Sequence, residues 1–459
     1  MVGNEIATEQ AATTTGEFKR VLSFRDLVIF GIAFLGPTAP YSMFGIATVK
    51  SGGHLPLVYL IAMVAMSFTA ISYGRMAAAY PEAGSTYSYT AKALHPAAGF
   101  LSGWAMTLDY ILIPMLSVIF IGLTANKLWP ETPYAVWAAL TTAVITVINL
   151  RGILLASRAN YVMNAIMSAS LIWFIALAAR ALWGGVGEGQ LISAKPFFNP
   201  QTFAFSDVMG ATSLAVLSFI GFDGVSTLAE DAKNPRRDIG RSTVVVCFVA
   251  GGLFIFQSYL AQMVWPDYTK FAPVETAFMD VGRLVGGDAL FYFISFALVV
   301  AGLACAITGQ ASASRLLCGM GRDRLLPYRI FGYVHPRLGT PVYSVLLMGG
   351  LHLIGALILK YTEAAELVNF GAFIGFMAVN LCVIRHYWLG KRERRLTDLI
   401  LPALGFVVCL YIWLHLSRLA MGLGLLWMVI GSLYLLWLTR GFKHQIASLN
   451  PEAKILRSE

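Results

Sequence analysis

The sequence predicts an all-α integral membrane protein with twelve transmembrane helices, and three observations support this fold class. Of the 459 residues, 58% are apolar or aromatic and only 12% are charged, against about 45–50% and about 25% in soluble domains. The mean hydropathy is +0.70. The charges fall in short clusters between long apolar stretches. This composition argues against a soluble multidomain enzyme and against a disordered or fibrous chain.

Each predicted spanning helix is a stretch of about 20 mostly apolar residues, the length that crosses a bilayer. Residues 1–22 are polar and are expected to form a disordered cytoplasmic tail without a cleavable signal. The twelve stretches lie near residues 26–49, 55–80, 97–125, 134–150, 159–183, 206–231, 241–265, 288–314, 341–359, 364–386, 398–417 and 420–440.

The basic residues predict the orientation of these helices. An even number of spans places both termini on one side of the membrane. With the N-terminus inside, Lys and Arg are about three times as frequent in cytoplasmic as in external segments, as the positive-inside rule requires. The net charge of +9 is therefore interpreted as a topology signal, and no nucleic-acid partner is expected. The five cysteines lie in or beside apolar segments without a CxxC pair, so neither a metal site nor a cofactor is predicted.

Two predicted spans contain helix-breaking residues at mid-membrane. The first has Gly36 and Pro37 followed by Pro40, and each proline removes a backbone donor. The sixth has Gly221 and Gly224 on either side of an acid. Interrupted helices at matching positions of two halves indicate the binding site of a transporter, because unwound backbone is tolerated where it lines a cavity. Alternatively, Pro and Gly are simply common in membrane helices.

Three segments resemble the amino acid–polyamine–organocation transporters. They are Phe222-Asp-Gly-Val-Ser-Thr-Leu-Ala-Glu-Asp231 with the following Lys-Asn-Pro-Arg-Arg, Tyr80-Pro-Glu-Ala-Gly-Ser-Thr-Tyr87, and Met320-Gly-Arg-Asp323 with a later proline. Within that family the chain is most similar to bacterial putrescine importers. This likeness rests on residues 221–223, on Gly-Trp at 103–104 with Leu-Asp-Tyr at 108–110 and Pro-Met at 114–115, and on Phe-Gly-Tyr-Val-His-Pro at 331–336.

The resemblance implies a fold and a mode of action. The implied core, residues 23–386, holds two inverted five-helix repeats of the LeuT type, near 26–183 and 206–386. Residues 387–440 then add two transmembrane helices, and residues 441–459 form a second cytoplasmic tail. The implied function is import of a small organic amine, such as putrescine or a related monoamine, by alternating access in the bacterial plasma (inner) membrane. The partners are a cationic amine or amino acid and the bilayer, and the protein is a monomer or a homodimer.

The candidate substrate-binding residues surround the two breaks. The chain lacks the Gly-Ser-Gly that amino-acid carriers of the family often use to hold a carboxylate, and it lacks the acid that putrescine importers carry after the proline of the first break. A monoamine, an aromatic amine or an amino acid therefore stays open as substrate. The candidate residues are Gly36, Pro37, Thr38, Tyr41, Ser42, Tyr110, Gly221, Phe222 and Asp223.

Acids inside predicted spans are costly and tend to be functional. Asp223 either contacts the substrate ammonium or caps the second half of its helix. Glu230 lies two turns further on and is interpreted as a proton-coupling or gating residue, or else as a salt-bridge partner of a cytoplasmic arginine. Asp109 either completes the substrate cavity or pairs with Arg75. Tyr87 is grouped with Glu230 and Asp109 as a candidate for coupling or gating.

The expected coupling ion is a proton, with sodium as the alternative. Thr308 and Ser312 could face a sodium site in the eighth span, or donate to carbonyls of their own helix. Tyr41, Tyr110 and Phe222 are the aromatic residues expected to face the substrate cation, since a desolvated cation–π contact is worth about 1–2 kcal/mol. A membrane-embedded enzyme and a channel are the rival classes. No P-loop, HExxH, Gly-x-Ser-x-Gly or repeated filter sequence supports either.

Overall fold

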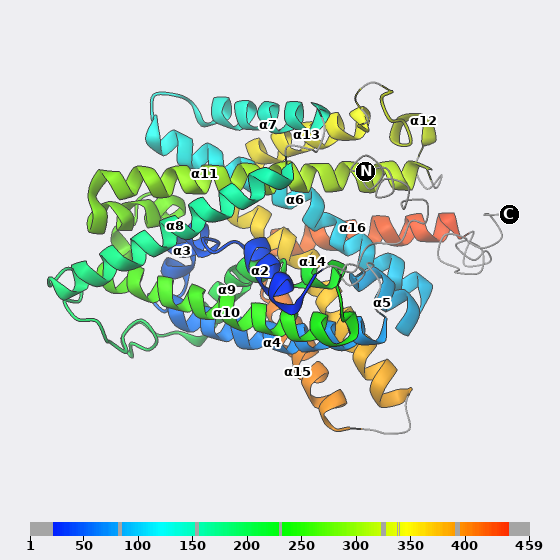
Figure 1. Ribbon diagram of the computed structural model, residues 1–459, viewed down its shortest axis with the longest axis horizontal. Helices are drawn as coiled ribbons and strands as arrows, with labels where there is room; N and C mark the ends of the chain where they lie inside the picture. The colour runs from blue at the N-terminus through cyan, green and yellow to red at the C-terminus, as the bar shows by residue number, and fades with distance from the viewer. Residues whose placement is uncertain are drawn as a thin grey trace, which may run out of the picture.

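The computed structural model describes residues 22–80, 85–151, 156–228, 232–322, 327–336, 338, 340–390 and 395–439, and these are almost entirely helical (Figure 1). Glu230 and the two predicted tails, apart from Leu22, lie outside the described residues. In chain order the elements are α2 (Phe24–Leu35), α3 (Pro40–Lys50), α4 (Leu55–Ala79), α5 (Ser85–Ala93), α6 (Pro96–Leu128), α7 (Tyr134–Arg151), α8 (Ala156–Trp183), α9 (Phe205–Ala215), η2 (Val216–Phe219), η3 (Phe222–Leu228), α10 (Pro235–Val264), η4 (Tyr268–Lys270), η5 (Val274–Thr276), α11 (Ala277–Arg322), α12 (Tyr328–Phe331), α13 (Val342–Ile358), α14 (Tyr361–Val383), η6 (Ile384–Leu389), α15 (Thr397–Leu414) and α16 (Arg418–Leu438).

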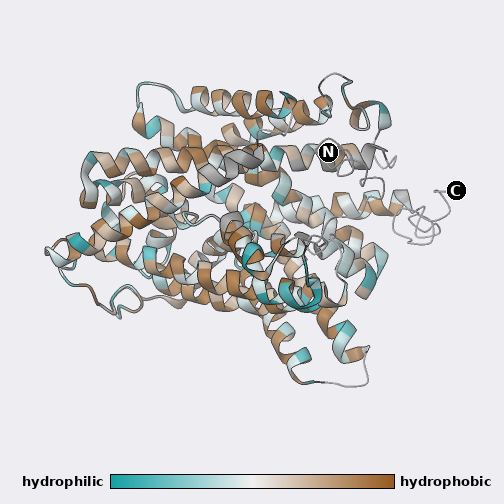
Figure 2. Ribbon diagram, in the orientation of Figure 1, coloured by the Kyte–Doolittle hydropathy of each residue, from teal (hydrophilic) through white to brown (hydrophobic). Residues whose placement is uncertain are grey.

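Nine helices in the described part of the chain are long and apolar enough to cross a membrane, and 205–219 and 342–358 form two shorter apolar helices. Apolar residues recur along the long helices (Figure 2). The prediction of an all-helical membrane protein is confirmed at this level. The two ends of the bundle are distinguished by the elements they carry. The α3 end carries α3 and the 184–204 loop, at the left of Figure 1, and the opposite end carries α5 and α12, at the right.

Both predicted helix breaks are present. α2 ends at Gly36, whose φ of 77° is the left-handed conformation that glycine adopts readily, and α3 begins at Pro40. In the sixth predicted span, α9 gives way to two 3-10 helices joined at Gly221, whose φ is 122°. The sequence therefore located both points at which regular helix stops.

The predicted loops are more helical than expected. The stretch 266–287 contains η4, η5 and the first turns of α11, which bends at Gly287. The short helix α5 occupies part of the link between the second and third predicted spans. Both differences have one cause: a 20-residue apolar window detects segments that cross a bilayer, whereas these helices are short or partly polar.

Buried polar side chains tie several long helices into one rigid layer. The Asn149 side-chain amide donates to the Gln310 Oε1 at 2.8 Å, and Gln310 Nε2 donates to Thr146 Oγ1 and to the Val345 carbonyl, both at 3.1 Å. These contacts join α7, α11 and α13. On the other side of the bundle α4 and α10 pack closely, with the Cα of Gly240 against Gly74.

Candidate functional site

The first break is poor in backbone donors. Pro37 and Pro40 have no N–H, and the Ala39 N–H donates to the Gly36 carbonyl at 3.0 Å. The carbonyl of Pro37, which the break frees from its helix, accepts a hydrogen bond from Gln257 Nε2 of α10 at 3.1 Å. A substrate carboxylate requires N–H donors, so this break is badly suited to bind one. Thr38 is buried, and Ser42 Oγ donates to the Ala39 carbonyl at 3.2 Å.

The second break carries Asp223 at the start of η3. The Ser226 hydroxyl donates to the Asp223 main-chain carbonyl at 2.6 Å, which closes the first turn of this 3-10 helix. The Asp223 side chain is partly buried. Its charge acts on Tyr73, Asp109 and Tyr110, three residues of α4 and α6. Asp223 thus faces the centre of the bundle.

A second acid, Asp109, lies near Asp223 in the bundle. Asp109 of α6 is 6% exposed, and its Oδ1 has no hydrogen-bond partner in the described part of the chain. It lies within electrostatic range of Asp223. Two carboxylates that repel each other in a weakly solvated interior are stabilised by a cation placed between them. We refer to Asp109 and Asp223 as the acid pair.

The predicted alternative of an Asp109–Arg75 ion pair is wrong. Arg75 Nη1 lies 2.6 Å from Asp398 Oδ1 and donates to the Thr397 carbonyl at 3.1 Å. Arg75 lies towards the end of α4, close to the start of α15, whereas Asp109 lies on α6. Completion of the substrate cavity is the interpretation of Asp109 that stays a prediction.

The predicted aromatic contacts divide into three environments. Tyr110 is 45% exposed and lies within electrostatic range of both acids. Phe222 is fully buried, and its ring packs edge-on against Tyr73. The centroid of the Phe222 ring lies 5.3 Å from that of Phe376. The Phe222 ring therefore packs η3 against α4 and α14.

Tyr41 belongs to a cluster at the α3 end that we call the aromatic seal, made of Tyr41, Phe44, Phe174 and Phe278. The Tyr41 ring stacks on Phe278 with centroids 3.7 Å apart, and Phe174 lies 4.7 Å from Phe278. The Tyr41 hydroxyl is buried without a hydrogen-bond partner among the described residues. These rings join α3 to α8 and α11 at the α3 end.

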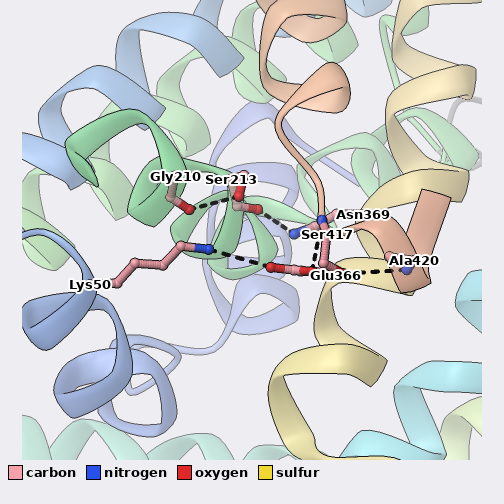
Figure 3. Close-up of polar contacts among 7 residues, drawn as sticks. All are labelled: Lys50, Gly210, Ser213, Glu366, Asn369, Ser417 and Ala420. Carbon is pink, nitrogen blue, oxygen red and sulfur yellow. Dashed lines mark hydrogen bonds and ion pairs between the residues drawn. The ribbon is translucent and has the colours of Figure 1, made fainter. Parts of the chain in front are cut away.

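A second contact of α3, an ion pair with α14, was not predicted from the sequence. Lys50 Nζ of α3 lies 3.4 Å from Glu366 Oε1 of α14, and Glu366 is nearly buried (Figure 3). The other Glu366 oxygen accepts the Ser417 N–H at 3.1 Å, where α16 begins. Beside it, the Asn369 amide donates to the Ser213 carbonyl of α9. An acid within a predicted span was the available signal, and Glu366 lies in the span predicted near 364–386.

The remaining candidates lie apart from the acid pair or outside the described residues. Tyr87 is on α5, where its exposed ring covers Gly103 of α6. Thr308 is exposed, and the side chain of Ser312 lies outside the described part of the structure. The Glu230 prediction stays untested for the same reason.

Replacing Gly371 by alanine is expected to disturb the acid pair. A Cβ at Gly371 of α14 would lie 2.4 Å from the Ala105 carbonyl oxygen and 3.3 Å from Asp109 Oδ1, so α14 and α6 would have to separate. Such overpacking costs about 1–3 kcal/mol. We expect a lower melting temperature of the purified protein and loss of uptake in proteoliposomes. Gly350→Ala is the control, because nothing lies within 4 Å of its Cβ position. Equal behaviour of the two variants would contradict this packing.

The fold and the site together define a class of protein. A bundle of membrane-spanning helices in which two are broken at depth, with acids inside the bundle, is the architecture of a secondary transporter. Comparison with known proteins supports the assignment to a class of transporters. Residues 26–444 match the family description of amino acid permeases.

Several characterised transporters are similar over nearly the whole chain. A low-affinity putrescine importer of Escherichia coli (strain K12) is 32% identical over 439 residues, covering 95% of this chain and 97% of the relative. A branched-chain amino acid permease of Bacillus subtilis (strain 168) is 27% identical, covering 92% and 93%. A methylthioribose transporter of the same organism is 25% identical, covering 93% and 95%. The chain belongs to the amino acid permease family and is a multi-pass membrane transporter, not an enzyme.

Proposed function

We propose that this transporter imports a small organic amine with more than one ammonium group, putrescine or a closely related diamine. The observation that carries the proposal is the acid pair, since two carboxylates within electrostatic range of each other complement two ammonium groups or one shared cation. The 32% identity to a putrescine importer supports the same substrate class.

The geometry of the first break argues for an amine rather than an amino acid. Its two prolines and its Ala39–Gly36 hydrogen bond leave few N–H groups for a carboxylate. Tyr110, exposed and within electrostatic range of both acids, offers a ring face to the cation. Gly36, Pro37, Thr38, Ser42 and Gly221 supply backbone and small side chains around the bound amine.

We further propose twelve spans arranged as two inverted five-helix repeats and two additional helices, with α2 and α3 as one span and α9 to η3 as another. The α3 end faces outward and both termini face the cytoplasm of a bacterial cell. Transport proceeds by alternating access as α2, α3, α4, α9–η3 and α10 rock against the other helices. The aromatic seal and the Lys50–Glu366 pair hold the described conformation closed towards the outside.

A proton is the proposed coupling ion. Glu230, an acid seven residues after Asp223 in the sequence, is proposed to bind a proton on the outer side together with the amine and to release it inside, so that the proton and the amine cross in the same direction. An inward proton gradient without sodium is expected to drive accumulation in proteoliposomes, and a strict sodium requirement would contradict the proposal.

Ligand-induced stabilisation tests the substrate class, because a ligand that binds the native state raises apparent stability by mass action. We expect putrescine and diamines of similar length to raise the melting temperature of the purified protein more than monoamines of equal length, and branched-chain amino acids to have no effect. Stabilisation by carboxylate-bearing solutes alone would replace this proposal with an amino acid permease.

A further inference from the structure

A cavity distinct from the acid pair lies where the last turns of α4, the first turns of α10 and the start of α15 approach one another. Its volume is about 800 Å³, and neither Asp109 nor Asp223 lines it. The backbones of α4 and α10 touch at its wall, since a Cβ on Gly74 would lie 2.6 Å from the Cα of Gly240. Its other wall is formed by Tyr387 of η6 and by residues at the start of α15.

The lining of this cavity carries an excess of positive charge. Four arginines line it and Asp398 is the one acid among the lining residues; Arg75 is already paired with Asp398 at 2.6 Å. Arg237, Arg241 and Arg395 are exposed and make no ion pair with any residue in the described ranges. Arg237 and Arg241 are four residues apart on α10, so they project from the same side of that helix.

An apolar wall continues from the arginines along the same helices. Val244 and Val245 follow Arg241 by one turn of α10, and Ile71 lines the cavity from α4. Val245 is 36% exposed. The cavity therefore has a cationic rim at the end of the spanning helices and an apolar side that runs towards the membrane interior.

We propose that this cavity binds an anionic phospholipid, with the headgroup phosphate on Arg237, Arg241 and Arg395 and an acyl chain along Val244 and Val245. Guanidinium groups bind phosphate oxygens in a bidentate manner, and basic pockets between transmembrane helices suit anionic headgroups. A free phosphate would use the arginines alone, whereas the apolar wall matches only a lipid. Lipid binding does not depend on the transported solute.

The lipid would also connect two parts of the protein. Arg237 and Arg241 lie on α10, which belongs to the proposed rocking group, and Arg395 precedes α15, which does not. This consequence, unlike the binding itself, rests on the proposed function.

Melting of the purified protein in a neutral detergent tests the site. Dioleoylphosphatidylglycerol added to the micelles is expected to raise the apparent melting temperature by about 2–4 °C relative to dioleoylphosphatidylcholine. The double variant Arg237→Gln with Arg241→Gln is expected to lose this shift. Arg395→Gln, on the opposite wall, is expected to reduce it and serves as an independent variant if the double variant folds poorly.

The matched control is Lys233→Gln with Arg236→Gln, which removes two exposed charges from the same region without touching the lining. It is expected to keep the full shift. The proposal is overturned by an equal shift with phosphatidylcholine, or by an equal loss in the control. It is likewise overturned if glycerol 3-phosphate, which lacks acyl chains, reproduces the shift.

Discussion

Asp223→Asn and Asp109→Asn are each expected to weaken putrescine binding about 10- to 100-fold. A hydrogen bond to a charged group contributes about 1.5–3 kcal/mol, and about 1.4 kcal/mol corresponds to a tenfold change in affinity. The two substitutions remove a charge while keeping the side-chain volume. The measurement is the dissociation constant for putrescine from binding to purified protein, together with the initial rate of uptake.

The two variants should also change selectivity in the same direction. With one acid left, a diamine loses its advantage over a monoamine of equal length, so the ratio of their affinities is expected to fall towards one. Asp207→Asn is the control, because Asp207 is exposed at the start of α9, where it accepts a hydrogen bond from Ser206. Unchanged putrescine affinity in Asp223→Asn would remove that residue from the amine site and leave it as a helix cap.

Glu366→Gln is expected to open the α3 end. The substitution removes the charge that holds Lys50 at 3.4 Å, and the Glu366 side chain is 7% exposed while that of Lys50 is 37% exposed. Breaking a buried ion pair costs about 3–5 kcal/mol, and the exposure of Lys50 lowers this to roughly 1–2 kcal/mol. A free-energy change of this size shifts the equilibrium constant between the closed and open conformations about tenfold.

Cysteine accessibility measures this opening. Thr48 of α3 is buried, and its hydroxyl donates to the Phe44 carbonyl. In a Thr48→Cys background, a membrane-impermeant maleimide applied from the α3 side is expected to react about ten times faster when Glu366→Gln is present. Glu363→Gln is the matched control, because Glu363 lies one turn earlier on α14 and accepts only the Lys360 N–H in the described structure. Equal rates in both backgrounds would show that the Lys50–Glu366 pair does not hold this end closed.

The two helix breaks could be predicted because their causes are local. Proline lacks a donor and glycine adopts positive φ, so Gly36, Pro37 and Gly221 mark the interruptions without any knowledge of neighbouring helices. The long apolar segments were predictable for the same reason, because bilayer thickness sets their length.

The meeting of the acid pair and the partner of Arg75 could not be predicted in this way. Whether Asp109 faces Asp223 or Arg75 depends on how α6 is rotated and on where α15 returns to α4, more than 300 residues along the chain. Glu366 is a different case: it lies far from both breaks in the sequence, and its charge within the tenth predicted span was the available signal.

The hydrogen bond from Gln257 to Pro37 has a consequence for the biogenesis of the protein. The two residues are 220 positions apart, and a ribosome adds about 5–20 residues per second. For roughly 10–40 s after the first helix leaves the ribosome, the carbonyl at its break therefore lacks the partner it has in the finished protein. In a bilayer such a group needs a substitute, such as water or a lipid headgroup. We therefore expect the first broken helix to insert early and to reach its final shape only after α10 has been inserted.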